Sequence, residues 1–96
     1  MATVFTSLPA GNDTTLVAAV TGKIVRVRRV VGGPTADFTL KSGSTAILPA
    51  LRSGTNSNVY VAFGDFPIVL GRGEALVAYN ASPTATDVYV EYDVVD

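Results

Sequence analysis

The sequence contains no cysteine, no histidine and no tryptophan, and charged residues make up only 16% of its 96 residues. Without cysteine the chain can form neither disulfide bonds nor a thiolate metal site. Imidazole is the commonest general base and metal ligand near neutral pH. The two absences together therefore exclude Cys–His and Ser–His–Asp catalysis and the usual zinc and copper sites. We expect a protein without enzymatic activity, metal or cofactor.

Carboxylate chemistry is the one catalytic route that these absences leave open. A glycosidase needs only a pair of suitably spaced carboxyl groups, and the candidates are Glu74, Glu91 and Asp93. Glu91 and Asp93 alternate with apolar residues, a pattern typical of the solvent-facing side of a strand. The remaining aspartates lie at or near turns and do not form the spaced cluster of a calcium loop. We therefore favour a non-enzymatic protein.

Neither sign of charge dominates, since seven basic and eight acidic residues give a net charge of −1. A general nucleic-acid binder usually has a basic domain, so this class is disfavoured. The first residues, MATVFTSLPAGND, lack the positive segment and apolar core of a signal peptide. No uncharged apolar run reaches the ~18 residues that a membrane span needs. We expect a protein that is neither secreted nor bound to a membrane.

Helical periodicity is missing as well. No segment places apolar residues at i, i+3, i+4 and i+7 over a useful length, so we expect essentially no helix. Turn signals containing Gly, Pro and Asn instead separate short segments rich in Val, Thr, Tyr and Phe, which predict strands. The predicted strands are Thr3–Ser7, Thr15–Val20, Lys23–Val31, Asp37–Lys41, Ser44–Leu48, Asn58–Phe63, Glu74–Asn80 and Asp87–Val95, with a short extended piece at Ile68–Leu70.

Strict alternation gives several of these strands one apolar face. In the last strand this face carries Val88, Val90, Tyr92 and Val94, and the other face carries Asp87, Tyr89, Glu91 and Asp93. In the segment 37–41, Phe38 and Leu40 are predicted to point inward. The segment Thr15–Val20 is apolar on both faces, which suits a strand covered on both sides.

About eight such strands predict an all-β fold, an antiparallel two-sheet β-sandwich of jelly-roll type. A seven-stranded immunoglobulin-like sandwich is the alternative, although its Cys…Trp…Cys signature is absent. At this length one domain is the default. We expect residues 1–96 to form a single β-sandwich domain, with residues 1–13 as a candidate N-terminal arm that a neighbouring subunit could hold.

The segment GKIVRVRRVV, Gly22–Val31, carries four of the seven basic residues. With regular alternation Arg29 would share the core face with Val25 and Val27, where an unpaired charge is costly. A β-bulge near Arg28 and Arg29 would turn both side chains outward. Alternatively, the strand ends early and leaves Arg29 at the rim of the sheet. We favour the bulge.

Nucleic acid is an unsuitable partner for this basic segment, because single-strand binders interleave basic residues with exposed aromatic rings and this segment has none. The last strand offers an outward acidic row instead, formed by Asp87, Glu91 and Asp93. We expect the basic and acidic strands to pair across a sheet or across a subunit contact. Contact with a different protein is the alternative.

Three stretches of the chain resemble a family of small tailed-phage virion proteins, namely TGKIVRV, DFTLKSGSTAILPAL and FGDFPIVLGRGEALVAYNASPTATDVYVEYDVV. They contain a Gly-Lys-apolar-x-Val strand, a strand ending in Lys-Ser-Gly, an aromatic-Pro turn and a Gly-Glu-Ala-Leu strand start. An Asn-x-Ser loop and a closing Val-x-Val-x-Tyr strand follow. The resemblance covers about residues 20–95.

Because such proteins are compact β-sandwiches on the virion, the resemblance implies a structural role without catalytic residues. The first expectation is a capsid decoration (cement) protein, made in the host cytoplasm, that bridges and stabilises major capsid subunits. A phage tail or fibre component is the alternative. A homo-oligomer is implied, and a homotrimer is favoured because it suits a local three-fold axis. No small-molecule substrate is implied.

Three features are candidates for contact with the major capsid protein or another virion protein: the arginine segment with its acidic counterpart, the GDFP turn and the N-terminal arm. The candidate interface residues are Phe5, Arg26, Arg28, Arg29, Phe66, Asp87, Glu91 and Asp93. A carbohydrate-binding β-sandwich module is the competing function, since Tyr60, Tyr79 and Tyr89 could offer stacking surfaces. These tyrosines lie on different predicted strands, which argues against a shared site.

Overall fold

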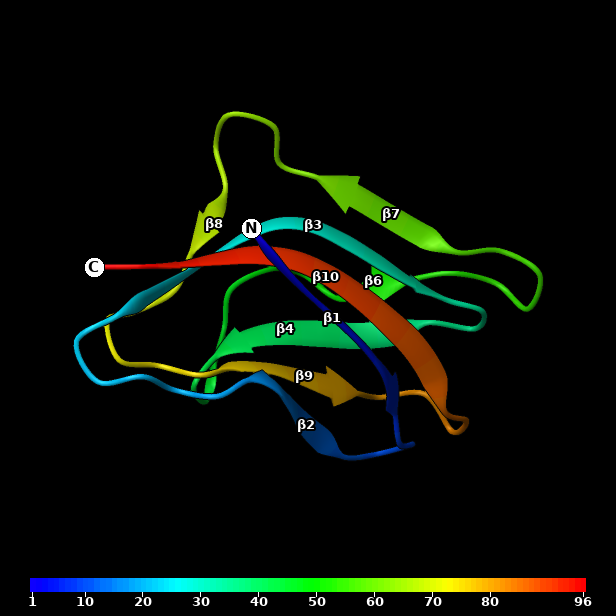
Figure 1. The fold of residues 1–96 in the computed structure, drawn as a ribbon. Coiled ribbons are helices and arrows are strands. Elements are labelled where there is room, and N and C mark those ends of the chain that lie inside the picture. Colours follow the sequence, from blue (N-terminus) through cyan, green and yellow to red (C-terminus); the bar gives the residue numbers. More distant parts are fainter.

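The computed structural model describes residues 1–96 and confirms the predicted all-β fold of two antiparallel sheets (Figure 1). There are ten strands rather than about eight. In chain order they are β1 (Ala2–Leu8), β2 (Asp13–Val17), β3 (Ile24–Gly33), β4 (Asp37–Ser42), β5 (Thr45–Ala46), β6 (Leu51–Arg52), β7 (Val59–Ala62), β8 (Ile68–Val69), β9 (Leu76–Asn80) and β10 (Thr86–Val95). No helix is present that could span a membrane.

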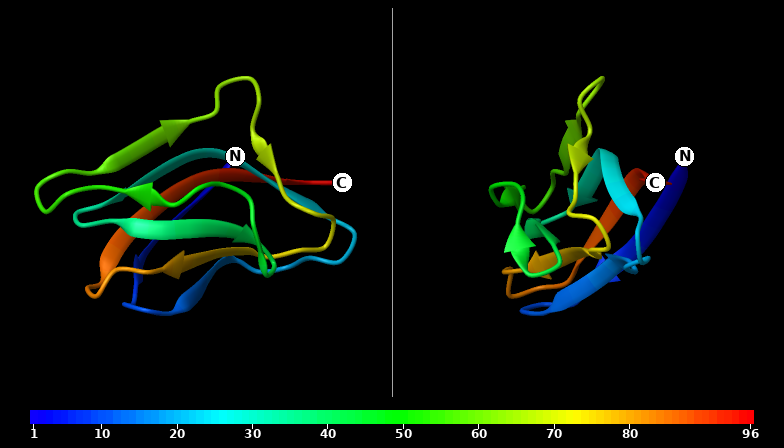
Figure 2. Two further views of the ribbon diagram at one scale, coloured as in Figure 1. Left: turned by 180° about the vertical axis from the view of Figure 1, so that it is seen from behind. Right: turned by 90° about the vertical axis from the view of Figure 1, so that its left-hand side faces the viewer.

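The strands divide into two five-stranded sheets (Figure 2). The first sheet has the order β1-β10-β3-β7, and β8 also pairs with β3. The second has the order β2-β9-β4-β5, and β6 also pairs with β4. The two ten-residue strands, β3 and β10, lie side by side at the centre of the first sheet and form its longest ladder.

The two additional strands arise because one outer strand in each sheet is interrupted. In the second sheet, β5 and β6 both pair with β4, and the segment between them contains Pro49. In the first sheet, β7 and β8 both pair with β3, and Pro67 lies between them. Proline has no backbone N–H to donate to a ladder, so each prolyl segment leaves its sheet before pairing resumes.

One hydrophobic core of 14 buried residues lies between the sheets. Phe38, Leu40 and Val90 are fully buried, as predicted from their alternation. Val94 departs from that prediction, because it lies near the end of β10 and is 43% exposed. The predicted strand Thr15–Val20 is also different, since β2 ends at Val17 and the residues after it are exposed rather than covered.

The candidate N-terminal arm is a strand of the sandwich in this structure. Residues 2–8 form β1 and pair with β10 from Ala2 opposite Tyr92 to Leu8 opposite Thr86. The alternation explains this placement, because Val4 packs against the core and Leu8 is fully buried. Val4 and Leu8 are therefore covered by their own domain, whereas Phe5, on the other face of the strand, is 71% exposed.

Candidate functional site

The outer face of the first sheet carries seven of the eight candidate interface residues. The bulge favoured from the sequence is present in β3: Arg29 lies opposite Glu91 and Val27 lies opposite Tyr92, so Arg28 is the additional residue. The bulge changes which positions face the core, since Val25 and Val27 are buried before it and Val30 is buried after it. As a result, two consecutive arginines, Arg28 and Arg29, stay outside the core.

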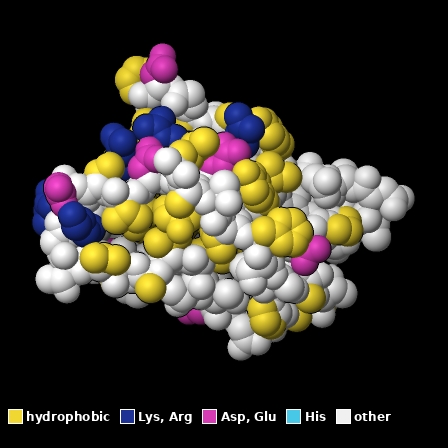
Figure 3. Space-filling view, in the orientation of Figure 1, with side chains coloured by type: hydrophobic (Ala, Val, Ile, Leu, Met, Phe, Trp, Pro, Cys, Tyr) yellow, Lys and Arg dark blue, Asp and Glu magenta, His cyan; other side chains and the backbone are white.

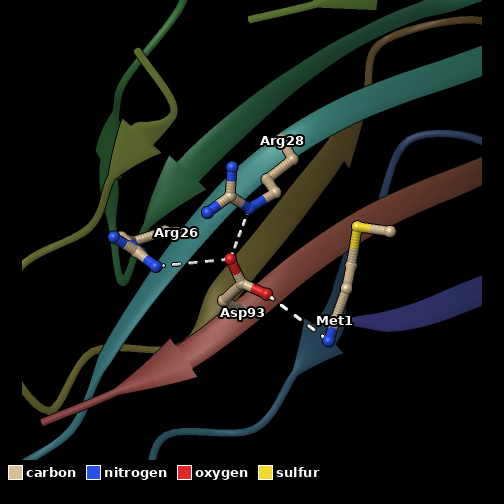
Figure 4. A network of polar contacts seen from close by, with 4 residues as sticks. All are labelled: Met1, Arg26, Arg28 and Asp93. Atoms are coloured by element: carbon tan, nitrogen blue, oxygen red, sulfur yellow. Dashed lines mark hydrogen bonds and ion pairs between the residues drawn. The ribbon is translucent and has the colours of Figure 1, made fainter. Parts of the chain in front are cut away.

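The arginines outside the core pair with carboxylates of their own chain, as Figure 4 shows for Asp93. Arg28 donates a hydrogen bond from Nε to Asp93 Oδ2, and Arg26 Nη2 lies 3.4 Å from the same oxygen. The Met1 amino group lies 3.7 Å from the other carboxylate oxygen of Asp93. One carboxylate therefore faces three positive groups from β3 and the chain terminus. The predicted pairing of the basic and acidic strands is thus found within one sheet.

Arg29 belongs to a second cluster on the same face. Its Nε atom lies 3.4 Å from Glu91 Oε1, and its guanidinium lies 5.6 Å from the centre of the Tyr60 ring. Tyr89 Oη donates a 2.8 Å hydrogen bond to Glu91 Oε2. This bond raises the pKa of the Tyr89 hydroxyl, because the proton is shared with a carboxylate, and partial burial acts in the same direction.

The hydrogen bond from Arg28 lowers the pKa of Asp93, and the nearby charges of Arg28, the N-terminus and Arg26 act in the same direction against partial burial. In the unfolded chain an aspartate titrates near its ordinary pKa of about 3.9. The folded chain therefore binds fewer protons at this site. The resulting stabilisation is present above the unfolded pKa and is lost as pH falls through the lowered folded pKa.

Asp93→Asn should for this reason lower the melting temperature at neutral pH, and the decrease should become smaller as the solution becomes more acidic. We expect the gap between wild type and variant to shrink as pH is lowered from about 6 to about 2. Thermal unfolding followed by circular dichroism across this range measures it. Asp65→Asn is the matched control, because Asp65 is exposed and forms no ion pair. A gap that stays constant with pH would contradict the assignment.

An aromatic row crosses the same face. Its three rings are Phe5 on β1, Tyr89 on β10 and Tyr60 on β7, and Val31 on β3 lies between the two tyrosines. Each residue is the direct register partner of the next. Phe5 is 71% exposed and Tyr60 is 59% exposed. Figure 3 views the molecule in the orientation of Figure 1, and hydrophobic side chains gather on this side beside a border of blue and magenta charged groups.

The remaining candidates lie in different places. Asp87 is exposed on β10 and lies opposite Ser7 and Gly33. Phe66 lies on the GDFP loop (Gly64–Pro67) between β7 and β8, and it is the most exposed large hydrophobic side chain, at 85%. This loop projects from the first sheet in Figure 1.

The three glycosidase candidates do not lie together, because Glu74 lies next to the second sheet and Glu91 and Asp93 lie on the first. Glu91 and Asp93 are held by arginines on the first sheet. Glu74 precedes β9 of the second sheet and accepts a 3.0 Å hydrogen bond from the Ser42 hydroxyl. No group of three or more acidic side chains could hold a metal ion.

Two of the tyrosines proposed as stacking surfaces do share a face, because Tyr60 and Tyr89 both belong to the aromatic row. Tyr79 lies apart on β9 of the second sheet, with Lys41 Nζ 5.4 Å from its ring centre. Asn58 and Gly33 also lie beside this row, and no local pattern predicts that they do. Asn58 precedes β7 and is brought there by the pairing of β7 with β3.

In comparisons with known proteins, no protein-family model matches the chain and no curated protein sequence matches it.

Proposed function

We propose that the protein is a non-enzymatic structural component of a phage virion, a decoration protein that binds the major capsid protein. The resemblance of residues 20–95 to small tailed-phage virion proteins supports this proposal. The fold is also suited to it, since two packed sheets around one core form a rigid body. The arginines of β3 are paired within the chain, so attachment rests on apolar surface rather than on free charge.

The observation that carries the proposal is the exposed Phe66 at the end of the GDFP loop. The loop is anchored at its base, because Phe63 N donates to Arg28 O at 3.0 Å and Phe66 N donates to Phe63 O at 3.1 Å. A large ring held away from the body of a small domain is the kind of anchor that fills a pocket on a partner. Phe66 makes no contribution to the protein's own core, so its ring is available to a partner.

Phe66→Ala tests this role. We expect the variant to bind capsids assembled without the protein about 30-fold more weakly, because a buried aromatic anchor contributes about 2 kcal/mol or more to binding. Its melting temperature should equal that of the wild type, since the ring is 85% exposed. Co-sedimentation with purified capsids measures binding. Tyr79→Ala is the control, because it removes an exposed ring from the other sheet.

Equal capsid binding by wild type and Phe66→Ala would overturn the role of the loop. Absence of wild-type binding to the capsid would overturn the decoration function itself. Binding to isolated tails or fibres in the same assay would replace it with the alternative within the family. Light scattering of the purified protein, with and without capsid, tests the proposed homotrimer, which a monomer under both conditions would contradict.

A further inference from the structure

A shallow hollow of about 250 Å³ lies at one end of the aromatic row, far along the first sheet from the GDFP loop. It lies over the end of β3, the start of β10 and the segment before β7. Its walls and floor combine aromatic rings, bare backbone and two polar side chains. The lining residues that matter here are Phe5, Tyr89, Gly32, Gly33, Asp87 and Asn58.

Two rings side by side form an aromatic platform in the hollow. Phe5 and Tyr89 are register partners on adjacent antiparallel strands and point to the same face. The Tyr89 ring is held in place, because its hydroxyl donates to Glu91 and Glu91 is in turn paired with Arg29. The platform is therefore preorganised on two strands rather than carried by a loop.

The absence of a side chain at Gly33 lets the segment before β7 approach the sheet beside the rings. A Cβ at this position would collide with Asn58 Oδ1 and would lie 2.9 Å from the carbonyl oxygen of Ser57. The φ angle of Gly33 is +143°, a value that residues other than glycine rarely adopt. The carboxamide of Asn58 consequently lies close against the sheet surface at the edge of the hollow.

The two polar groups of the hollow have free hydrogen-bonding capacity. Asp87 is exposed and takes part in none of the seven ion pairs, whereas Glu91 and Asp93 on the same strand are both neutralised by arginines. Asn58 is exposed and its carboxamide forms no side-chain hydrogen bond within the chain. A carboxylate and a carboxamide beside a flat aromatic surface can bind hydroxyl groups while the rings cover an apolar face.

We propose that this hollow binds one neutral saccharide unit, with a pyranose ring stacked on Phe5 and Tyr89 and its hydroxyls bonded to Asp87 and Asn58. The unpaired carboxylate of Asp87 opposes phosphates and other anions. A cation is the competing ligand, because the carboxylate of Asp87 and the ring faces would both attract one, and choline chloride tests it below. The volume is below that of drug-sized pockets and suits a single sugar ring.

The test is nuclear magnetic resonance titration of the ¹⁵N-labelled full chain. The probes are methyl β-glucoside, methyl β-galactoside, methyl α-mannoside and N-acetylglucosamine, each added singly. We expect at least one probe to shift the amide signals of Gly32, Gly33 and Tyr89, with a dissociation constant on the order of 1 mM. Phe5→Ala should weaken binding about tenfold, because one stacking surface is lost.

Asp87→Ala should weaken the binding of the same probe. Two control variants test whether the loss of any exposed ring or carboxylate has the same effect. Tyr79→Ala and Asp65→Ala remove an equivalent ring and an equivalent carboxylate elsewhere, and both should bind as the wild type does. The proposal is overturned if no probe shifts these amides, or if the Phe5 and Asp87 variants bind normally. It is also overturned if choline chloride or inorganic phosphate produces the shifts and the sugars do not. Capsid binding through Phe66 is a separate measurement, so each proposal can fail alone.

Discussion

Replacing Asn80 by alanine is expected to lower the free energy of unfolding by about 3 kcal/mol or more, one of the two largest effects predicted for this protein. Asn80 is fully buried at the end of β9. Its Nδ2 group donates to Leu8 O at 2.9 Å and to Thr84 O at 3.0 Å, and its Oδ1 atom accepts from Ser82 N at 2.9 Å. One side chain thus satisfies three backbone groups from the end of β1 and the loop before β10.

The size of the effect follows from what alanine leaves behind. Each buried backbone group that loses its partner costs about 1–3 kcal/mol. Two such groups are affected, Leu8 O and Ser82 N, together with the part-buried Thr84 O. Urea unfolding followed by circular dichroism measures the change. Asn12→Ala is the matched control, because Asn12 is exposed and its side chain bonds only to Ala10 O. Equal stabilities of the Asn80 and Asn12 variants would contradict the bridging role of Asn80.

Phe38→Ala is the second substitution with a large expected effect, a loss of about 3–5 kcal/mol. Phe38 is the largest fully buried side chain, and it extends from β4 toward β3 in the opposite sheet. A methyl group added at Gly32 would collide with the edge of the Phe38 ring. The ring therefore fills the space between the sheets that the missing side chain at Gly32 leaves open.

The pairing of Phe38 with Gly32 predicts that their substitutions are not additive. Gly32→Ala alone should cost about 1–3 kcal/mol, because the added carbon displaces a ring in a close-packed core. In the double variant the alanine at position 32 enters the cavity left by the ring, so the combined loss should be smaller than the sum. Urea unfolding of the four proteins in this cycle measures the coupling. Strict additivity would show that the two residues do not share this space.

The features of the fold that depend on local alternation were predictable from the sequence. Phe38 and Leu40 are buried because apolar residues at every second position give a strand one core face. The bulge at Arg28 was predictable for a related reason, because a regular strand would have placed the Arg29 charge in the core. In both cases the cost of burying the wrong side chain determines the local structure.

The two-residue strands were less predictable, because their pairing depends on a neighbour and not on their own pattern. Leu51 and Arg52 lie in none of the predicted strands, yet they pair with Phe38 and Asp37 on β4. The sequence predicts an extended piece at Ile68–Leu70 but no partner for it, and in the structure β8 pairs with β3. Segments this short contain too few residues to show a period.

The candidate saccharide site could be predicted only in part, for the same reason. The sequence predicts that Tyr60 and Tyr89 could offer stacking surfaces. It does not predict that the two tyrosines share a row, because their strands are far apart in the sequence. Asn58 and Asp87 are brought to the hollow by the pairing of β7 and β10 with β3. The sheet order, which no local pattern determines, is what assembles this surface.

The pattern on both sides of the bulge fixes the register of β3. Before it, Val25 and Val27 face the core, and after it, Val30 and Gly32 do so, which means that inward positions change from odd to even numbers. A slip of β3 by one residue against β10 would turn Val25, Val27 and Val30 outward and Arg26 and Arg29 inward, so apolar side chains would be exposed and charges buried on both sides of Arg28. One extra residue therefore lets the strand carry two consecutive arginines outside the core and still keep valines in the core on both sides of them, and deleting Arg28 would leave Val25, Val27 and Val30 in regular alternation.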